Sequence, residues 1–190
     1  MIKDKNDLKE YLTADDKNYQ FLKGYNIKKI INASPISDNS AIWEYIYTLR
    51  HCEYAINRNL KLRKIYYLWK LRKLSYKTGF QIPPNVIGKG VTLYHYGMII
   101  INSEAKIGEN CTIHPDVVIG KKEKNGAPPC IENDVYICSG ARIIGNITIG
   151  HNTKIAPNTY VYKNTPPNCV ISGNPACIVK KDGMKVNIKL

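Results

Sequence analysis

An aliphatic residue recurs every six positions through the second half of the chain, and this period restricts the possible folds more than any other feature. The in-phase residues are Ile101, Ile107, Ile113 and Ile119 and then, after a gap of twelve, Ile131, Ile137, Ile143, Ile149, Ile155 and Val161. A period of six fits neither an α-helix, with 3.6 residues per turn, nor a single strand, with an alternation of two. It fits short strands separated by turns, in which each hexad adds one inward-pointing side chain to a continuous core. The sequence therefore predicts a parallel β-helix built from hexapeptides.

Two interruptions of the period indicate where chemistry is expected. Two extra residues lie between Leu93 and Ile101, within the irregular stretch 94–97. Residues 121–130 read Lys-Lys-Glu-Lys-Asn-Gly-Ala-Pro-Pro-Cys, which is too polar and too rich in Pro and Gly for a strand. Insertions in a solenoid commonly gather on its binding face. We therefore expect residues 121–130 to protrude as a loop and both interruptions to lie near the active site.

The first half of the chain has a helical period instead. Residues 41–57 carry apolar side chains at spacings of three and four, with Asp38 or Ser40 as the predicted N-cap. Residues 60–78 form a second predicted helix that ends at Gly79.

These patterns divide the chain into three parts. A shorter predicted helix at residues 5–12 completes an N-terminal helical region, 1–79. The β-helix occupies residues 80–165, and residues 166–190 form a C-terminal segment.

The basic charge of the chain is concentrated in the second long helix. The 28 Lys and Arg residues exceed the 15 Asp and Glu residues by 13, and residues 60–78 alone hold seven basic and no acidic side chains. Lys and Arg beside Trp and Tyr suit contact with an anionic membrane surface. The solvated face of a helix packed on its neighbours gives the same pattern, and we favour that interpretation. No nucleic-acid-binding module accompanies the charge, so no nucleic-acid partner is expected.

The remaining composition favours a cytoplasmic protein without a metal. No apolar run is long enough to span a bilayer, and residues 1–7 lack the apolar core of a secretory signal. The six cysteines form no Cys-x-x-Cys pair, so we expect free thiols in a reducing compartment. The four histidines lie too far from them in sequence for a local zinc signature. A cytoplasmic location is therefore expected, peripheral at the membrane if the basic helix binds lipid.

Several segments resemble the serine O-acetyltransferase-like hexapeptide-repeat acyltransferases, of the kind associated with surface polysaccharide synthesis. The resemblance covers residues 79–180 and rests on the segments 79–85, 93–97, 105–111, 139–147 and 172–176. It implies a left-handed β-helix of triangular cross-section and a homotrimer with active sites between subunits. It also implies acetyl-CoA as the donor and a hydroxyl group as the acceptor.

His95 matches the catalytic position of that family and is the predicted general base. A neutral hydroxyl attacks a thioester slowly unless a base takes its proton, and an imidazole suits that work near neutral pH. The same group can return the proton to the departing thiolate, so no covalent acyl-enzyme is required. Gln81 aligns with the acid that usually orients this histidine. His114 is either a hydrogen-bond donor at the acceptor cleft or a plain surface histidine.

The resemblance also implies a coenzyme A groove along the later coils. Small residues that leave room for the pantetheine arm are expected at Ser139, Gly140, Ala141 and Ala156. The segment near the adenine end is matched by Gly173, Pro175 and Ala176. Lys180 or Lys181 would meet the nucleotide phosphates as point charges, and a frayed basic tail is the alternative for both.

Two departures from the family determine the predicted acceptor. Serine enzymes hold a zwitterion with a carboxylate and an Arg. Here Tyr94 replaces the Asp that precedes the catalytic histidine, and residues 127–129 read Ala-Pro-Pro in place of Arg-His-Pro. Tyr94 and Tyr96 suggest an aromatic wall for a sugar ring, and Asp116 is a further acid for the acceptor site or for orienting His95. We therefore expect acetylation of a surface glycan or its precursor, with serine acetylation and an inactive β-helix scaffold as alternatives.

Overall fold

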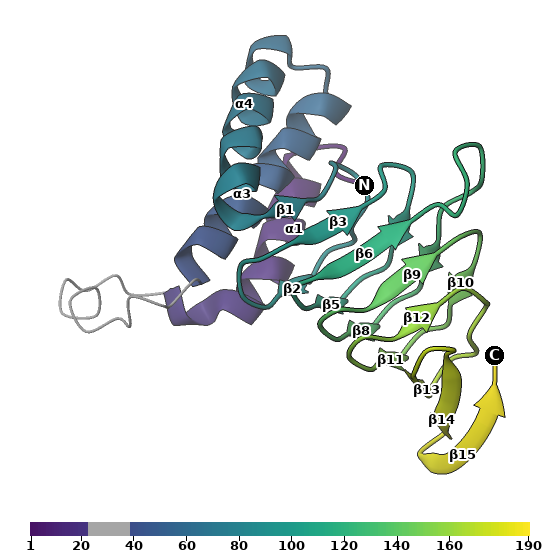
Figure 1. Cartoon of the computed structure of the whole chain (residues 1–190). Helices are drawn as coiled ribbons and strands as arrows, with labels where there is room; N and C mark the ends of the chain where they lie inside the picture. The colour runs from purple at the N-terminus through teal and green to yellow at the C-terminus, as the bar shows by residue number, and fades with distance from the viewer. Residues whose placement is uncertain (23–38) are drawn as a thin grey trace.

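The computed structural model describes residues 1–22 and 39–190 and places a helical unit on one end of a stack of β-coils (Figure 1). The helices are α1 (Lys5–Asp16), the 3-10 helix η1 (Lys17–Leu22), α3 (Asn39–Asn57) and α4 (Lys61–Thr78). α3 packs against both α1 and α4. The coils descend from this unit to the C-terminal strands at the opposite end (Figure 1).

Successive coils contribute their strands to three sheets. The first sheet contains β1 (Phe80–Gln81), β3 (Ile99–Ile101), β6 (Val117–Gly120), β9 (Arg142–Ile144) and β12 (Tyr160–Val161). The second contains β4 (Lys106–Ile107), β7 (Cys130–Ile131) and β10 (Thr148–Ile149). The third contains β2 (Thr92–Leu93), β5 (Thr112–Ile113), β8 (Tyr136–Ile137), β11 (Lys154–Ile155), β13 (Cys169–Ser172), β14 (Cys177–Lys181) and β15 (Met184–Lys189).

Pairing is parallel from coil to coil and becomes antiparallel at the C-terminus. β5 pairs with β2 and β8 in parallel, whereas β14 pairs antiparallel with β13 and β15. The C-terminal segment is therefore an ordered extension of the third sheet, and the alternative of a frayed basic tail is wrong.

The hexad column forms the core, as the period predicts. None of the ten in-phase aliphatic residues is more than 5% exposed. Residues four positions later in the repeat are also buried, including Cys111 and Thr159 at 0%. Each hexad thus contributes two inward side chains, and the coils share one continuous interior.

The turns between strands use left-handed residues, most of them Asn or Asp. Five such turns have φ between 52° and 59°, at Asn110, Asp134, Asn152, Asn158 and Asn168. Short polar side chains tolerate this region because they bond the local backbone. Among the described non-glycine residues with positive φ, His95 is the one that is neither Asn nor Asp, so the histidine described below is an exception to the local rule.

Side chains of the helical unit replace a missing coil at the top of the β-helix. The first coil has no neighbouring coil on that side, so its backbone N–H and C=O groups need other partners. The contacts are as follows: Tyr45 bonds both backbone groups of Ile82, Glu53 accepts from Asn85, Arg50 donates to Ile87 and Gly88, Asp15 accepts from Gly90 and Val91, Asn18 donates to Gly90, and Tyr19 bonds both backbone groups of Leu93. Solenoids require a cap at their terminal repeat, and here polar side chains supply it.

A buried ion-pair network holds this cap together. Arg50 is fully buried, with Nε 2.7 Å from an Asp15 oxygen and Nη1 3.1 Å from a Glu53 oxygen. Burial alone would lower the pKa of Arg50, but the two carboxylates raise it, so the guanidinium stays charged. The network ties α1, α3 and the first coil into one unit.

The three predicted helices are present among the described residues and differ from the prediction at their ends, and η1 was not predicted. The helix predicted at 5–12 extends to Asp16, and Asp4 caps it by accepting from Asn6 and Asp7. Ser40 lies inside α3 rather than before it, so it is not the N-cap, and Asp38 lies outside the described residues. α4 ends at Gly79, whose φ of 81° is the predicted left-handed stop.

Residues 121–129, between β6 and β7, extend from the coils as a loop (Figure 1), and Cys130, the last residue of the predicted loop, begins β7 instead. Lys121 at its start pairs with Glu104 at 2.6 Å. No helix among residues 1–22 and 39–190 is long and apolar enough to cross a membrane.

Candidate active site

His95 lies at an exposed corner between β2 and β3, and the corner is held on both sides. Its φ of 53° falls in the left-handed region, which costs a non-glycine residue about 1–3 kcal/mol. On one side the Tyr19 hydroxyl bonds both backbone groups of Leu93. On the other side the Gly97 N–H donates to the Thr78 carbonyl at 2.8 Å. These contacts stabilise the strained corner while the imidazole faces solvent.

The imidazole of His114, which belongs to the next coil, lies beside Tyr94. The two rings stack with centroids 4.7 Å apart and an interplanar angle of 16°. His114 Nε2 is 2.7 Å from the Tyr136 hydroxyl oxygen. Burial lowers the pKa of His114, and the nearby charges of His95 and Lys154 lower it further. The His114 imidazole is therefore neutral near neutral pH, and it serves as a hydrogen-bonding group rather than as a second cation.

The predicted contact between Gln81 and His95 is not present. Gln81 ends β1 with an exposed side chain, and within the described chain no hydrogen bond joins it to His95. The His95 ring contacts Tyr94, with centroids 6.3 Å apart. Tyr96 is 52% exposed on the same corner. Within one chain, nothing among the described residues orients the His95 ring by a hydrogen bond.

Asp116 belongs to an ion pair one coil below this corner. Its backbone N–H donates to the Met98 carbonyl at 2.6 Å. Arg142 Nη2 lies 3.1 Å from Asp116 Oδ1, and Arg142 Nη1 donates to the Asp116 and Gly140 carbonyls. The pair is half-exposed, and Arg142 Nε has no partner among the residues that the structure describes.

Arg142 is the candidate that sequence reasoning missed. Its signal was an Arg at an outward position of a hexad, directly after the inward Ala141. A lone outward Arg in a repeat carries no motif, and only the stacking of coils reveals that it lies against Asp116.

The predicted coenzyme A residues separate into an exposed edge and a buried set. Turns of successive coils hydrogen-bond along one edge below His95, with the Asn158 N–H donating to Ser139 at 3.0 Å and the Tyr160 N–H to Gly173 at 3.4 Å. Ser139, Gly173 and Pro175 are exposed and Ala156 is half-exposed. This edge offers small side chains to a ligand.

The other members of that set do not face a ligand. Ala141 is fully buried and Ala176 is 3% exposed, because both methyl groups point into the core. Gly140 is also buried, and a Cβ there would collide with the Asn158 side-chain oxygen, so packing alone explains the glycine. Lys180 pairs with Val170 and Lys181 with Cys169, at the end of β13 away from Gly173. The two lysines are exposed, but the strand separates them from the edge below His95.

His151 and the cysteines are not part of the corner at His95. His151 lies at another turn, with Nδ1 3.2 Å from Glu132. The six cysteines are free thiols, as predicted. No group of three His, Cys, Asp or Glu residues in the described ranges could hold a metal ion.

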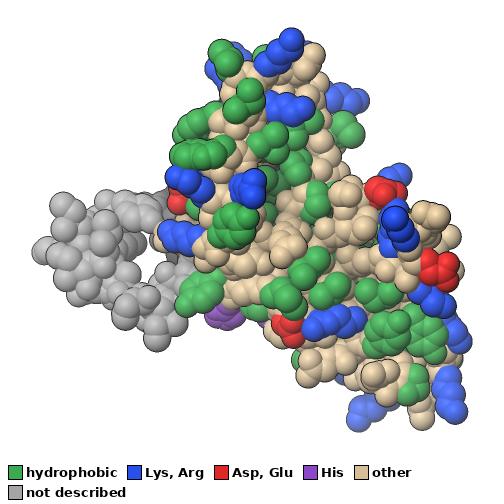
Figure 2. Space-filling view, turned by 45° about the horizontal axis from the view of Figure 1, so that its top comes forward, with side chains coloured by type: hydrophobic (Ala, Val, Ile, Leu, Met, Phe, Trp, Pro, Cys, Tyr) green, Lys and Arg blue, Asp and Glu red, His purple; other side chains and the backbone are tan. Residues whose placement is uncertain are grey.

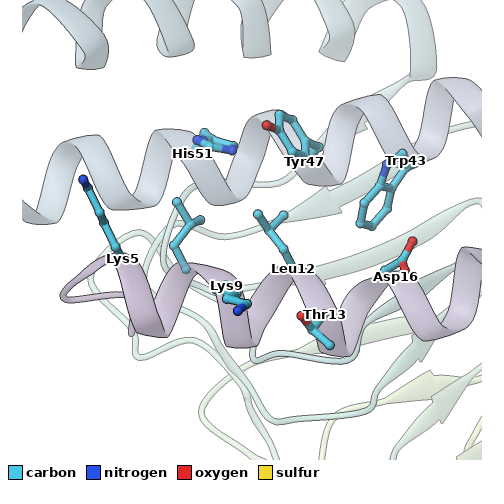
Figure 3. A pocket seen from close by; sticks show the side chains of 9 residues that line it. Lys5, Lys9, Leu12, Thr13, Asp16, Trp43, Tyr47 and His51 are labelled. Carbon is cyan, nitrogen blue, oxygen red and sulfur yellow. The ribbon is translucent and has the colours of Figure 1, made fainter.

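A cavity of about 420 Å³ lies between α1 and α3 and contains none of the predicted site residues (Figure 3). Trp43, Tyr47 and His51 line it from α3, and Lys5 and Lys9 are among its α1 residues. Its position in the helical unit separates it from the corner that carries the catalytic candidates.

Comparison with known proteins identifies the repeat. The family described as "Bacterial transferase hexapeptide (six repeats)" matches residues 131–163. Serine acetyltransferase of Staphylococcus xylosus is 32% identical over 151 residues, which is 77% of this chain and 66% of the relative. Serine acetyltransferase of Staphylococcus aureus strain Mu50 is 37% identical over 112 residues, 57% of this chain and 53% of the relative. The chain thus spans less than two thirds of the length of these relatives.

Solved structures of serine acetyltransferases have a similar fold. Serine acetyltransferase from Brucella abortus strain S19 in complex with coenzyme A matches with a TM-score of 0.71 and 25% identity over 95% of this chain and 71% of that chain. The Neisseria gonorrhoeae enzyme in complex with serine matches with a TM-score of 0.66 and 25% identity, over 93% and 70%. The predicted left-handed β-helix with an N-terminal helical region is confirmed.

The predicted glycan acceptor is wrong. The relatives, at up to 37% identity, are named serine acetyltransferases, and so are the structural neighbours, which favours the serine alternative. The aromatic wall expected for a sugar ring is also less available, because His114 already covers one face of Tyr94. In its repeat and its fold, the chain is similar to the serine acetyltransferases among the hexapeptide-repeat transferases.

Proposed function

We propose that this protein is an acetyl-CoA-dependent O-acetyltransferase that acylates the hydroxyl group of L-serine. The observation that carries the proposal is the position of His95, exposed at a strained corner at the head of an edge of small residues. A relative with the same fold binds coenzyme A and another binds serine, which supports both substrates.

His95 acts as the general base in a direct transfer. Its imidazole takes the proton from the serine hydroxyl as the oxygen bonds to the thioester carbonyl carbon. When the C–S bond breaks, the imidazolium gives that proton to the departing sulfur, so O-acetylserine and free coenzyme A form without an acyl-enzyme. The exposed corner lets both substrates reach the same ring.

The donor lies along the edge formed by Ser139, Ala156 and Gly173. These residues are small and exposed or half-exposed, and they follow one another on consecutive coils below His95. An extended pantetheine arm fits such an edge because no large side chain blocks it.

The serine zwitterion is held by the pair Asp116 and Arg142. Serine carries an ammonium and a carboxylate, which are complementary to a carboxylate beside a guanidinium. Arg142 retains an unpartnered Nε–H among the described residues, and Asp116 is bonded to it through Oδ1. The pair therefore supplies both charges that residues 94 and 127–129 lack.

The active unit is a homotrimer whose sites lie between subunits. Tyr94, Tyr96 and Met98 are 40–52% exposed around His95, so the corner offers an apolar surface to a neighbouring subunit. Such a neighbour would also shield the reacting thioester from water.

The test is coenzyme A release from acetyl-CoA with L-serine as acceptor. We expect turnover with L-serine and a loss of about 10²–10⁴-fold in kcat for His95→Ala. His151→Ala is the matched control, because it removes an exposed turn histidine at a different corner and should keep full activity. Turnover that survives in His95→Ala, or activity with a sugar but not with serine, would refute the proposal. Absence of turnover together with absence of acetyl-CoA binding would indicate a scaffold.

A further inference from the structure

Helix α4 has two apolar faces, and only one of them is packed. Leu71, Leu74 and Thr78 are buried against the rest of the protein. A second set of large apolar side chains is between 54% and 85% exposed, at Leu62, Ile65, Tyr66, Trp69 and Tyr76. At about 100° per residue these five lie within an arc of about 100° on the side opposite the buried face. We call this set the outer stripe.

Basic side chains lie beside the outer stripe on both sides at the same 100° per residue, with Lys61 and Arg72 on one side and Lys70, Lys77 and Arg63 on the other. Lys73 lies within the stripe, and Lys64 lies on the side of the buried face. α4 contains seven basic and no acidic residues, at Lys61, Arg63, Lys64, Lys70, Arg72, Lys73 and Lys77. Lys73 Nζ lies 3.8 Å from the centroid of the Trp69 ring. Of the seven, only Lys70 makes an ion pair within the described ranges, with Glu44 at 3.0 Å. Figure 2 shows hydrophobic and basic side chains interleaved over the helical unit in the upper part of the molecule.

We propose that the outer stripe of α4 docks onto an anionic lipid surface. The apolar side chains enter the boundary between headgroups and acyl chains, and the flanking Lys and Arg residues bind lipid phosphates. Trp69 and the tyrosines combine an apolar ring with a polar edge, which suits that boundary. The interpretation of α4 as a packed helix with a solvated basic face does not account for the outer stripe, because a solvated face does not require five large exposed apolar residues.

The charge distribution argues against a two-fold contact between the α4 helices of two copies of this chain. A two-fold contact places the same patch on both partners, so two α4 helices would bring fourteen basic side chains together with no acid from either helix. It also argues against a nucleic acid. Phosphates would satisfy the basic residues, but Leu62 and Ile65 would stay in water.

Docking through α4 fixes how the protein sits on the lipid. α4 belongs to the helical unit at one end of the molecule, and the C-terminal strands lie at the other (Figure 1). The coils therefore project away from the surface. The proposal does not depend on the identity of the acceptor substrate.

The experiment mixes the full chain with vesicles of phosphatidylcholine alone or with an equal amount of phosphatidylglycerol. Co-sedimentation gives the bound fraction. The change in Trp emission is assigned to Trp69 by comparison with Trp69→Phe, because Trp43 also emits. We expect at least about tenfold stronger binding to anionic vesicles, a blue shift of Trp emission, and loss of binding at high salt. Each Lys or Arg near such a surface changes the partition about fivefold.

Three double variants separate the contributions. Leu62→Gln with Ile65→Gln keeps the charge, alters only exposed positions, and should abolish the blue shift and most binding. Lys61→Glu with Lys77→Glu reverses one charge on each side of the stripe and should lower binding more than about 25-fold. Lys122→Glu with Lys124→Glu makes the same charge change in the 121–129 loop and should bind like the wild type.

Three results would overturn the proposal. The first is wild-type protein that does not bind anionic vesicles. The second is binding that is unchanged in the Leu62 and Ile65 variant, which would indicate a simple polyanion contact such as RNA. The third is a fall in oligomer mass for that variant in light scattering without lipid, because it would show that another copy covers the stripe.

Discussion

Tyr19→Phe removes one oxygen atom that holds the strand leading into the catalytic corner. The Tyr19 hydroxyl donates to the Leu93 carbonyl at 3.2 Å and accepts from the Leu93 N–H at 2.5 Å. Tyr19 is 3% exposed, and burial raises its pKa, so the hydroxyl is a neutral donor at all working pH values. Leu93 lies in β2, at the edge of its sheet, so no neighbouring strand can replace these bonds.

The expected cost follows from the two groups left behind. Phe fills the same space, so the loss of apolar packing is small and the effect comes from the unpaired N–H and C=O of Leu93. Each unsatisfied buried backbone group costs about 1–3 kcal/mol. Because a water molecule has little room to replace the hydroxyl, we expect the free energy of unfolding to fall by about 2–4 kcal/mol. The kcat for serine acetylation should fall as well, since His95 is two residues from Leu93.

Tyr45→Phe is the matched control for this prediction. Tyr45 makes the same pair of bonds to Ile82, but they are longer, at 3.3 and 3.4 Å. Its substitution also leaves two buried backbone groups unpaired and should cost about 2–4 kcal/mol, but it should leave kcat unchanged because Ile82 is not next to His95. Urea unfolding and steady-state kinetics of both variants measure the difference. An equal effect of the two substitutions on kcat would show that the bonds to Leu93 do not position the corner.

Asp15→Ala leaves the buried Arg50 without its main ion-pair partner, so the free energy of unfolding should fall by about 3–5 kcal/mol, as measured by urea unfolding. A loss below about 1 kcal/mol would mean that water already reaches the pair. Arg142→Lys keeps the charge but loses the forked geometry, so the KM for L-serine should rise about tenfold while that for acetyl-CoA stays constant; the reverse pattern would place Arg142 at the donor instead. The lowered pKa of His114 means that the unfolded chain binds the proton more readily, so its contribution to stability is present above about pH 6.5 and is lost as the pH falls below it. His114→Gln should flatten that decline in melting temperature between pH 6.5 and 5, and an unchanged slope would assign the decline to other groups.

The β-helix could be predicted because its core repeats a short local rule. Ile113 and Ile137 occupy equivalent positions on paired strands, and every such pair obeys the same inward period. The corner at His95 was also predictable, since an interruption of a regular pattern is visible in the sequence alone.

The cap could not be predicted because its contacts are long-range and follow no period. Asp15 and Gly90 are 75 residues apart in sequence, and Tyr19 and Leu93 are 74 apart. In the sequence Asp15 is one more acidic residue of a short helix. Only the unpaired edge of the first coil gives it a partner, and that edge exists only once the fold is formed.

The error about the acceptor has the same origin. It treated Tyr94 and residues 127–129 as the positions that must carry the charges for a zwitterion. A stack of coils relaxes that requirement, because residues from successive coils become neighbours: Asp116 and Arg142 are 26 apart in sequence and 3.1 Å apart in space. Under the proposed function, this pair supplies the charges for serine from the coils below His95, where no motif beside the histidine indicates it. Acceptor specificity in such a fold is better inferred from the charges along an edge than from the residues beside the catalytic histidine.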